Sequence, residues 1–165
     1  MSVPPFSLAQ GLNAVEQAAF FRVYSGDDKE FTFAGIKGKV AVIFYETKES
    51  KEVNRPLKEE LNRFLAELPD ASKRQVARLA VINCQGVFLT GIWKQALREN
   101  SQKEGLTIYG DWDGKMAQDY GMQPEASNFL IIDKKGVIRY FAKGPAPKEK
   151  FGEIKDLLRR LAENG

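Results

Sequence analysis

The sequence of 165 residues contains no histidine and only one cysteine, Cys84. A single cysteine cannot form an intrachain disulfide or a resident dithiol. Without histidine, the usual zinc sites, Ser-His-Asp triads and Cys-His dyads are excluded. Asp111 and Asp113 could suggest calcium, but an EF-hand-like loop needs further oxygen ligands and a glutamate at its twelfth position. We therefore expect a turn at Asp111 and Asp113, and neither a metal nor a cofactor.

The sequence also lacks a long apolar run and a marked excess of charge. No apolar stretch approaches the roughly 18 residues that cross a bilayer, so we expect no membrane span. The net charge of +3, from 25 basic and 22 acidic residues, is too small to indicate a nucleic acid partner. Residues 1–10 lack the basic-then-apolar layout of a signal peptide, as would a chain that begins at its mature residue.

What is present is typical of a folded domain. The chain is 43% hydrophobic and 28% charged, and its length suits a single domain. Apolar periodicity and turn residues predict strands at residues 20–24, 31–33, 40–45, 79–82, 106–109, 129–132 and 137–142. They predict helices at residues 53–68, 88–96, 115–120 and 151–161. Strands that alternate with helices indicate an α/β fold with a largely parallel sheet, to which the final hairpin adds antiparallel strands.

The apolar run at 40–45 has no polar residue, as expected of a central strand that is covered on both faces. Asn54 can cap the helix that follows, and Val53 fits packing into the core at its start. The residues expected in the core are Val42, Phe44, Leu61, Phe64, Leu79, Val81, Leu130, Ile132, Ile154 and Leu158. The apolar side chains that mark the helix at 88–96 are Phe88, Leu89, Ile92, Trp93 and Ala96.

Three segments together resemble the redoxin branch of the thioredoxin superfamily, which includes AhpC/TSA and TlpA-like proteins. Residues 31–45 are similar to the approach to its catalytic strand, residues 109–121 to its inserted strand and helix, and residues 130–138 to its returning hairpin. The resemblance implies a thioredoxin-like fold: a central mixed β-sheet flanked by helices, with an N-terminal hairpin and a strand–helix insertion. We expect one such domain over residues 1–165, with its core at about 20–161 and an N-terminal extension at 1–19.

The catalytic cysteines of that superfamily are missing. The resemblance places the Cys-x-x-Cys motif within residues 46–55, and no register puts a cysteine there. Glu49 and Glu52 are the positions where a cysteine pair would be restored. In a peroxiredoxin-like alignment the cysteine position falls on Val53, the supporting threonine on Ser50 and the supporting proline on Glu46.

A second catalytic feature is missing independently. Six residues before the acid that ends the strand, thioredoxins carry a cis-proline and peroxiredoxins an arginine. Counting back from Asp133 gives Ser127, which is neither. The loss of two separate features indicates that the ancestral redox activity is gone, and that Glu49, Ser50, Glu52, Val53 and Ser127 mark a degenerate site.

Cys84 follows the strand expected at 79–82. Free cysteine is among the most buried residue types, so we expect a small core residue. The alternative is a reactive thiol in a single-cysteine thiol or peroxide oxidoreductase. That role needs a cationic or helix-start environment, and the neighbours Asn83 and Gln85 supply no charge.

The function class follows from these features. Residues 46–60 hold nine charged side chains, which favours a solvated face over an alternating-charge docking surface. The Ser-Lys-Glu-x-Asn core at residues 50–54 resembles a cysteine-poor, YtfJ-like group of enterobacteria, which looks periplasmic and has no settled activity. This resemblance implies a periplasmic or secreted protein, with the cytoplasm as the alternative location. Our hypothesis is a redox-inactive thioredoxin-like binding or accessory module with a protein partner in a bacterial cell envelope.

Overall fold

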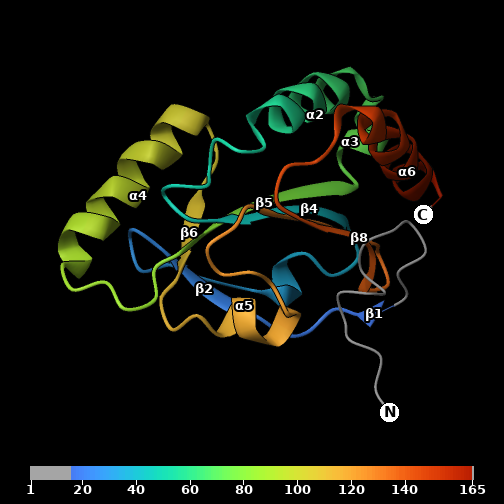
Figure 1. The fold of residues 1–165 in the computed structure, drawn as a ribbon. Coiled ribbons are helices and arrows are strands. Elements are labelled where there is room, and N and C mark those ends of the chain that lie inside the picture. Colours follow the sequence, from blue (N-terminus) through green and yellow to red (C-terminus); the bar gives the residue numbers. More distant parts are fainter. Residues whose placement is uncertain (1–15, 165) are drawn as a thin grey trace, which may run out of the picture.

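The structure is a computed structural model that describes residues 16–164 (Figure 1). Its strands are β1 (Glu16–Gln17), β2 (Arg22–Ser25), β3 (Glu30–Thr32), β4 (Val40–Glu46), β5 (Val76–Asn83), β6 (Ile108–Asp111), β7 (Asn128–Ile132) and β8 (Val137–Lys143). Its helices are α2 (Arg55–Glu67), α3 (Asp70–Lys73), α4 (Thr90–Glu104), α5 (Lys115–Tyr120) and α6 (Phe151–Glu163), with short 3-10 turns η1 (Phe33–Gly35) and η2 (Lys148–Lys150). Most of the N-terminal extension expected at 1–19 lies outside the described residues.

The strands form one mixed sheet in the order β1-β8-β7-β4-β5-β6-β2-β3. β5 pairs in parallel with β4 and β6, whereas β7 pairs antiparallel with β4 and β8. The expected N-terminal hairpin is β2 and β3, and the returning hairpin is β7 and β8. The predicted α/β class and the central place of the strand at 40–45 are therefore confirmed. β1 was not predicted, because two residues carry no periodic pattern.

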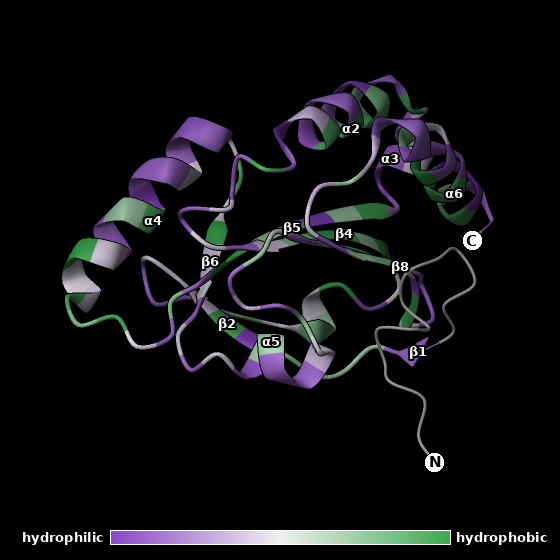
Figure 2. Ribbon diagram, viewed as in Figure 1, coloured by the Kyte–Doolittle hydropathy of each residue, from purple (hydrophilic) through white to green (hydrophobic). Residues whose placement is uncertain are grey.

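Helices cover both faces of the sheet (Figure 1). α2 and α6 pack on one face, where Leu61 and Ile154 join a buried cluster with Val42 of β4. α5 packs on the other face, where Met116 joins a cluster that includes Ile43. Figure 2 shows hydrophobic residues along the strands between these layers. Alternate residues of β4 thus enter two separate cores, as the unbroken apolar run requires.

Most of the predicted core residues are buried, but two aromatic ones are not. Phe44 and Phe64 are half-buried against the cluster between the sheet and α2 and α6. Phe44 lies on the central strand, and its incomplete burial shows that part of this sheet face has no helix over it.

The apolar residues at two helix starts are also more exposed than expected. Val53 lies in the turn before α2, which begins at Arg55, and its side chain is 42% exposed. Phe88 and Leu89 precede α4, which begins at Thr90, and both are exposed. The prediction that Val53 packs into the core was wrong, because the helix starts two residues later and turns this side chain to solvent.

Candidate functional site

The degenerate site lies in the connection between β4 and α2. Two reciprocal hydrogen bonds close this turn: the Ser50 backbone N–H donates to Thr47 Oγ1 and the Thr47 backbone N–H donates to Ser50 Oγ, both at 2.9 Å. Both side chains are buried. Ser50 therefore holds the shape of the loop, and its hydroxyl is engaged within the turn.

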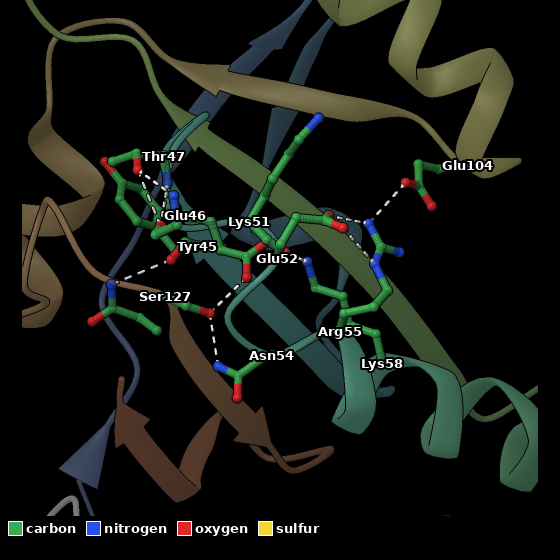
Figure 3. Close-up of polar contacts among 12 residues, drawn as sticks. Tyr45, Glu46, Thr47, Lys51, Glu52, Asn54, Arg55, Lys58, Glu104 and Ser127 are labelled. Carbon is green, nitrogen blue, oxygen red and sulfur yellow. Dashed lines mark hydrogen bonds and ion pairs between the residues drawn. The ribbon is translucent and has the colours of Figure 1, made fainter. Parts of the chain in front are cut away.

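Glu46, the last residue of β4, points into the protein and is 4% exposed. Its Oε1 accepts a hydrogen bond and ion pair from Lys58 Nζ at 2.5 Å, and its Oε2 accepts from Ser127 Oγ at 2.6 Å (Figure 3). Lys58 Nζ also donates to the Lys51 carbonyl at 2.7 Å and lies 5.2 Å from the centre of the Phe44 ring. A buried carboxylate is thus paired at both oxygens, which is the condition for keeping a charge inside a protein.

Asn54 connects this arrangement to the loop that follows β8. Its Nδ2 donates to Ser127 Oγ at 2.7 Å, and its Oδ1 accepts from the Ala146 backbone N–H at 2.8 Å. We call Glu46, Asn54, Lys58 and Ser127 the Glu46 network. Asn54 does occupy the N-cap position of α2, but its side chain makes no capping hydrogen bond. The expected capping role is wrong, because these tertiary bonds use the amide instead.

Burial is the dominant influence on the protonation of Glu46. It raises the pKa of this carboxyl above its ordinary value, although Lys58 and the Ser127 hydroxyl act in the opposite direction. The network contains a carboxylate, an ammonium, an amide and a hydroxyl, and no thiol. Such a set stabilises a fixed local geometry, and its members are already bonded to one another.

The other predicted site residues point elsewhere. Glu49, Glu52 and Val53 are exposed, and only Ser127 joins the network. Glu52 pairs with Arg55 at 2.5 Å, and this contact lowers the pKa of Glu52. Arg55 also reaches Glu104, at the end of α4, at 3.3 Å (Figure 3). The expected solvated face of charges is therefore correct for Glu49 and Glu52 but wrong for Glu46, which lies inside.

Cys84 follows β5 and lies in a separate buried cluster, against which Ala80 and Ile82 of β5 also pack. It is 1% exposed and packs near Leu97 of α4 and Ile108 of β6, so the expectation of a buried residue is confirmed. Burial, together with the nearby Asp111 carboxyl, raises the pKa of the thiol to about 12. At neutral pH the sulfur is therefore a protonated thiol, which is a poor nucleophile.

Asp111, next to this cluster, is fully buried, which the sequence did not reveal. Its Oδ2 accepts from the Tyr45 hydroxyl at 2.7 Å and from the Ala117 backbone N–H at 3.3 Å. Its Oδ1 has no hydrogen-bond partner within residues 16–164, and burial raises the pKa of the carboxyl. The predicted turn after β6 is present, and Trp112 packs as expected, with Nε1 3.4 Å from the Tyr24 carbonyl.

A groove of about 280 Å³ adjoins the Glu46 network. It lies between α2 and α4, and residues of β4 and β5 form part of its lining. Glu46 and Lys58 belong to both the network and the groove, and Arg55 also lines the groove. The groove is a recess beside the degenerate site, and no pattern in the sequence indicated it, because α2 and α4 are brought together only by the fold.

Two further features bear on the kinds of site present. Across residues 16–164, no group of three or more cysteine or acidic side chains is placed to hold a metal ion. In the same part of the chain, none of the helices is both long and apolar enough to cross a membrane.

Comparisons with known proteins bear on the fold. No protein-family model matches the chain, and no curated protein matches it. Among solved structures, a peroxiredoxin-like protein from Aquifex aeolicus is 19% identical with a TM-score of 0.61, covering 93% of this chain and 90% of that one. The exposed lipoprotein thioredoxin of Streptococcus pneumoniae is 20% identical with a TM-score of 0.60, covering 87% and 100%. DsbF of MTB is 18% identical with a TM-score of 0.58, covering 86% and 94%. The chain therefore has a thioredoxin-like fold.

Proposed function

We propose that this chain is a redox-inactive thioredoxin-like domain that acts as a binding or accessory module. The observation that carries the proposal is the Glu46 network. It joins the start of α2 to the residue before β7, the two places where the resemblance locates the thiols and the cis-proline or arginine. Ser127 donates to Glu46 at 2.6 Å, so the residue at the cis-proline or arginine position is bonded to a carboxylate at the end of β4, and neither place carries a thiol.

The chemistry of the alternatives supports this reading. A disulfide reductase resolves its mixed disulfide with a second thiol, and this chain has only one cysteine. A single-cysteine enzyme needs an accessible thiolate, whereas Cys84 is 1% exposed with a pKa raised to about 12. Burial and protonation together therefore disfavour Cys84 as a nucleophile.

A bacterial cell envelope is the proposed location. The resemblance of residues 50–54 to the periplasmic YtfJ-like group favours it. The likeness of the fold to an exposed lipoprotein thioredoxin is consistent with it. Fractionation of the native host, with an antibody against this chain, tests the location separately from the activity.

Activity assays test the redox part of the proposal. We expect no insulin reduction, and peroxide consumption no faster than that of a free thiol in the same buffer. Cys84→Ser is the matched variant, because serine keeps the size of the side chain and removes the sulfur. Rapid turnover by the wild type that Cys84→Ser abolishes would contradict the proposal.

A further inference from the structure

The floor of the groove between α2 and α4 is set by the register of β4 and β5. Val42 pairs with Arg78, Phe44 with Ala80 and Glu46 with Ile82. Alternate residues of a strand share one face, so these side chains line the same side of the sheet. Val42 and Leu61 lie in one buried cluster, which places this face toward α2. The middle of the floor is the half-buried Phe44 ring beside the small Ala80 side chain.

The two walls are apolar helix faces. Leu61 and Leu65 of α2 form one wall, and Ile92, Trp93 and Ala96 of α4 line the other. Ile92 is 62% exposed, although an apolar residue on the inner side of a helix normally packs against a neighbour. Arg55 and Glu104 bridge the two helices at one end. The recess is thus bounded on three sides by apolar side chains, and those of the floor and of α4 keep accessible surface.

The charges around the groove are predominantly positive. Its lining includes five cationic residues and two acidic ones, Glu46 and Glu104. Lys58 is paired with Glu46, and Arg55 with Glu52 and Glu104. The remaining cations are Lys48, Lys51 and Arg78. Within residues 16–164, none of these three lies within ion-pair distance of a carboxylate.

We propose that this groove binds an amphipathic anion with a single apolar chain. The inference rests on the proposed function, since it names the ligand class of the binding module. A volume of about 280 Å³ holds roughly nine atoms of the size of a water or methylene group, which corresponds to one chain of about eight to ten carbons.

The orientation of the ligand follows from the free cations. Lys48 and Lys51 line the groove from the turn that follows Glu46. The Lys51 carbonyl and the Glu46 carboxylate accept from the same Lys58 ammonium, so this turn lies at the end of the floor that Glu46 marks. Figure 3 shows the Lys51 ammonium extending away from Glu46 and Lys58. Arg78 lies at the opposite end and already donates to Asn62 Oδ1 at 2.5 Å. The anionic head group binds at Lys48 and Lys51, and the chain lies over Phe44 toward Ile92.

A titration of the full chain with decanoate, below its micelle concentration, tests the site. In amide NMR spectra we expect saturable shifts at Phe44, Ile92 and Trp93. Ala96→Phe places a ring in the groove and should weaken binding by roughly tenfold or more, because it displaces several buried methylenes. Gln95→Phe adds the same ring at the exposed neighbouring position and should change affinity by less than about twofold. Equal effects of the two variants, or shifts confined to other residues, would overturn the proposal.

The head group is tested with a matched pair of ligands and variants. Decanol should bind more weakly than decanoate, and decyl phosphate at least as well as decanoate. Replacing Lys48 and Lys51 together by alanine should weaken the binding of decanoate roughly fivefold, since each exposed ion pair contributes little. The affinity for decanol should be unchanged. Replacing Lys134 and Lys135, in the hairpin after β7, is the control and should have no effect.

The outcomes separate this inference from the proposed function. If the chain has no redox activity and does not bind decanoate, only the proposed ligand class is refuted. If the chain shows redox turnover that depends on Cys84, the proposed redox-inactive function is wrong, whatever the groove binds. If decanoate causes no shifts but an acidic, leucine-rich peptide shifts Phe44 and Trp93, the occupant is a protein segment and the proposed small anion is wrong.

Discussion

Two buried carboxylates lie at the ends of strands of the same sheet, and they differ in their hydrogen-bond and ion-pair partners. Glu46 closes β4 and Asp111 closes β6, and burial raises the pKa of both. Glu46 has an ammonium on one oxygen and a hydroxyl on the other. Asp111 has a phenol and a backbone N–H on one oxygen, and no hydrogen-bond partner for the other within residues 16–164. Charge is therefore compensated at the degenerate site and only partly compensated beside Cys84.

This difference indicates what each region does for the protein. The Glu46 network connects β4, α2 and β7, so its loss should affect the whole fold. Asp111 bonds to Tyr45 across the sheet and to the start of α5. Because Asp111 Oδ1 has no hydrogen-bond partner within residues 16–164, burying the charged carboxylate is costly. The contribution of Asp111 to the free energy of unfolding should therefore depend on pH.

The largest expected effect comes from removing the cation of the Glu46 network. Lys58→Met keeps the apolar stem but leaves the Glu46 carboxylate buried without a counter-charge. Because an uncompensated buried charge is costly, we expect the free energy of unfolding to fall by about 3–5 kcal/mol. Chemical denaturation monitored by circular dichroism measures the change.

The matched control is Lys155→Met on α6, since Lys155 makes a 2.7 Å ion pair with the more exposed Glu60. That variant should lose no more than about 1 kcal/mol. The double variant of Glu46→Gln with Lys58→Met should lose less than Lys58→Met alone. A loss below about 1 kcal/mol for Lys58→Met would show that the network does not stabilise the fold.

A smaller effect is expected from pH at Asp111. The folded-state pKa of this carboxyl is raised, so the folded protein binds the proton more tightly than the unfolded chain. The resulting stability is fully present below the unfolded pKa, about 3.9, and is lost as pH rises through the folded pKa. Asp111→Asn should therefore flatten the dependence of unfolding free energy on pH above pH ~4.

Glu46→Gln gives the comparison, because the pKa of Glu46 is raised in the same direction. We expect it to flatten the pH profile less than Asp111→Asn does. Lys58 compensates the Glu46 charge, whereas within residues 16–164 Asp111 Oδ1 has no hydrogen-bond partner. The reverse order would mean that Glu46 carries the larger uncompensated cost. Equal, unaltered profiles for both variants would contradict the assigned burial effects.

Local patterns in the sequence were sufficient for most of the strands and helices but not for the site. The apolar run at 40–45 and the glycine of the final hairpin correctly indicated β4, β7 and β8. Glu46 stood among eight other charged residues, and nothing local distinguished it from a solvated one. Its two partners, Lys58 and Ser127, are 12 and 81 residues away. Only the pairing of β4 with β7 brings Ser127 to this carboxylate.

Burial was misjudged wherever it depended on the placement of a helix. Phe44 has the pattern of a core residue, but α4 lies beside β6 and leaves it half-covered. Val53 and Phe88 have apolar side chains next to predicted helices, and both are exposed because those helices begin two residues later. Where a helix starts and how it is displaced over the sheet are tertiary properties, and a periodic pattern does not encode them.

The most direct test of the redox-inactive account is the reactivity of Cys84 in the native protein. Labelling with a thiol-specific disulfide reagent at neutral pH should be slow, and should become rapid only when denaturant unfolds the chain. The account predicts this because the thiol is 1% exposed and burial raises its pKa to about 12. Fast native labelling, with a rate that titrates at a pKa well below the ordinary value of about 8.5, would contradict it.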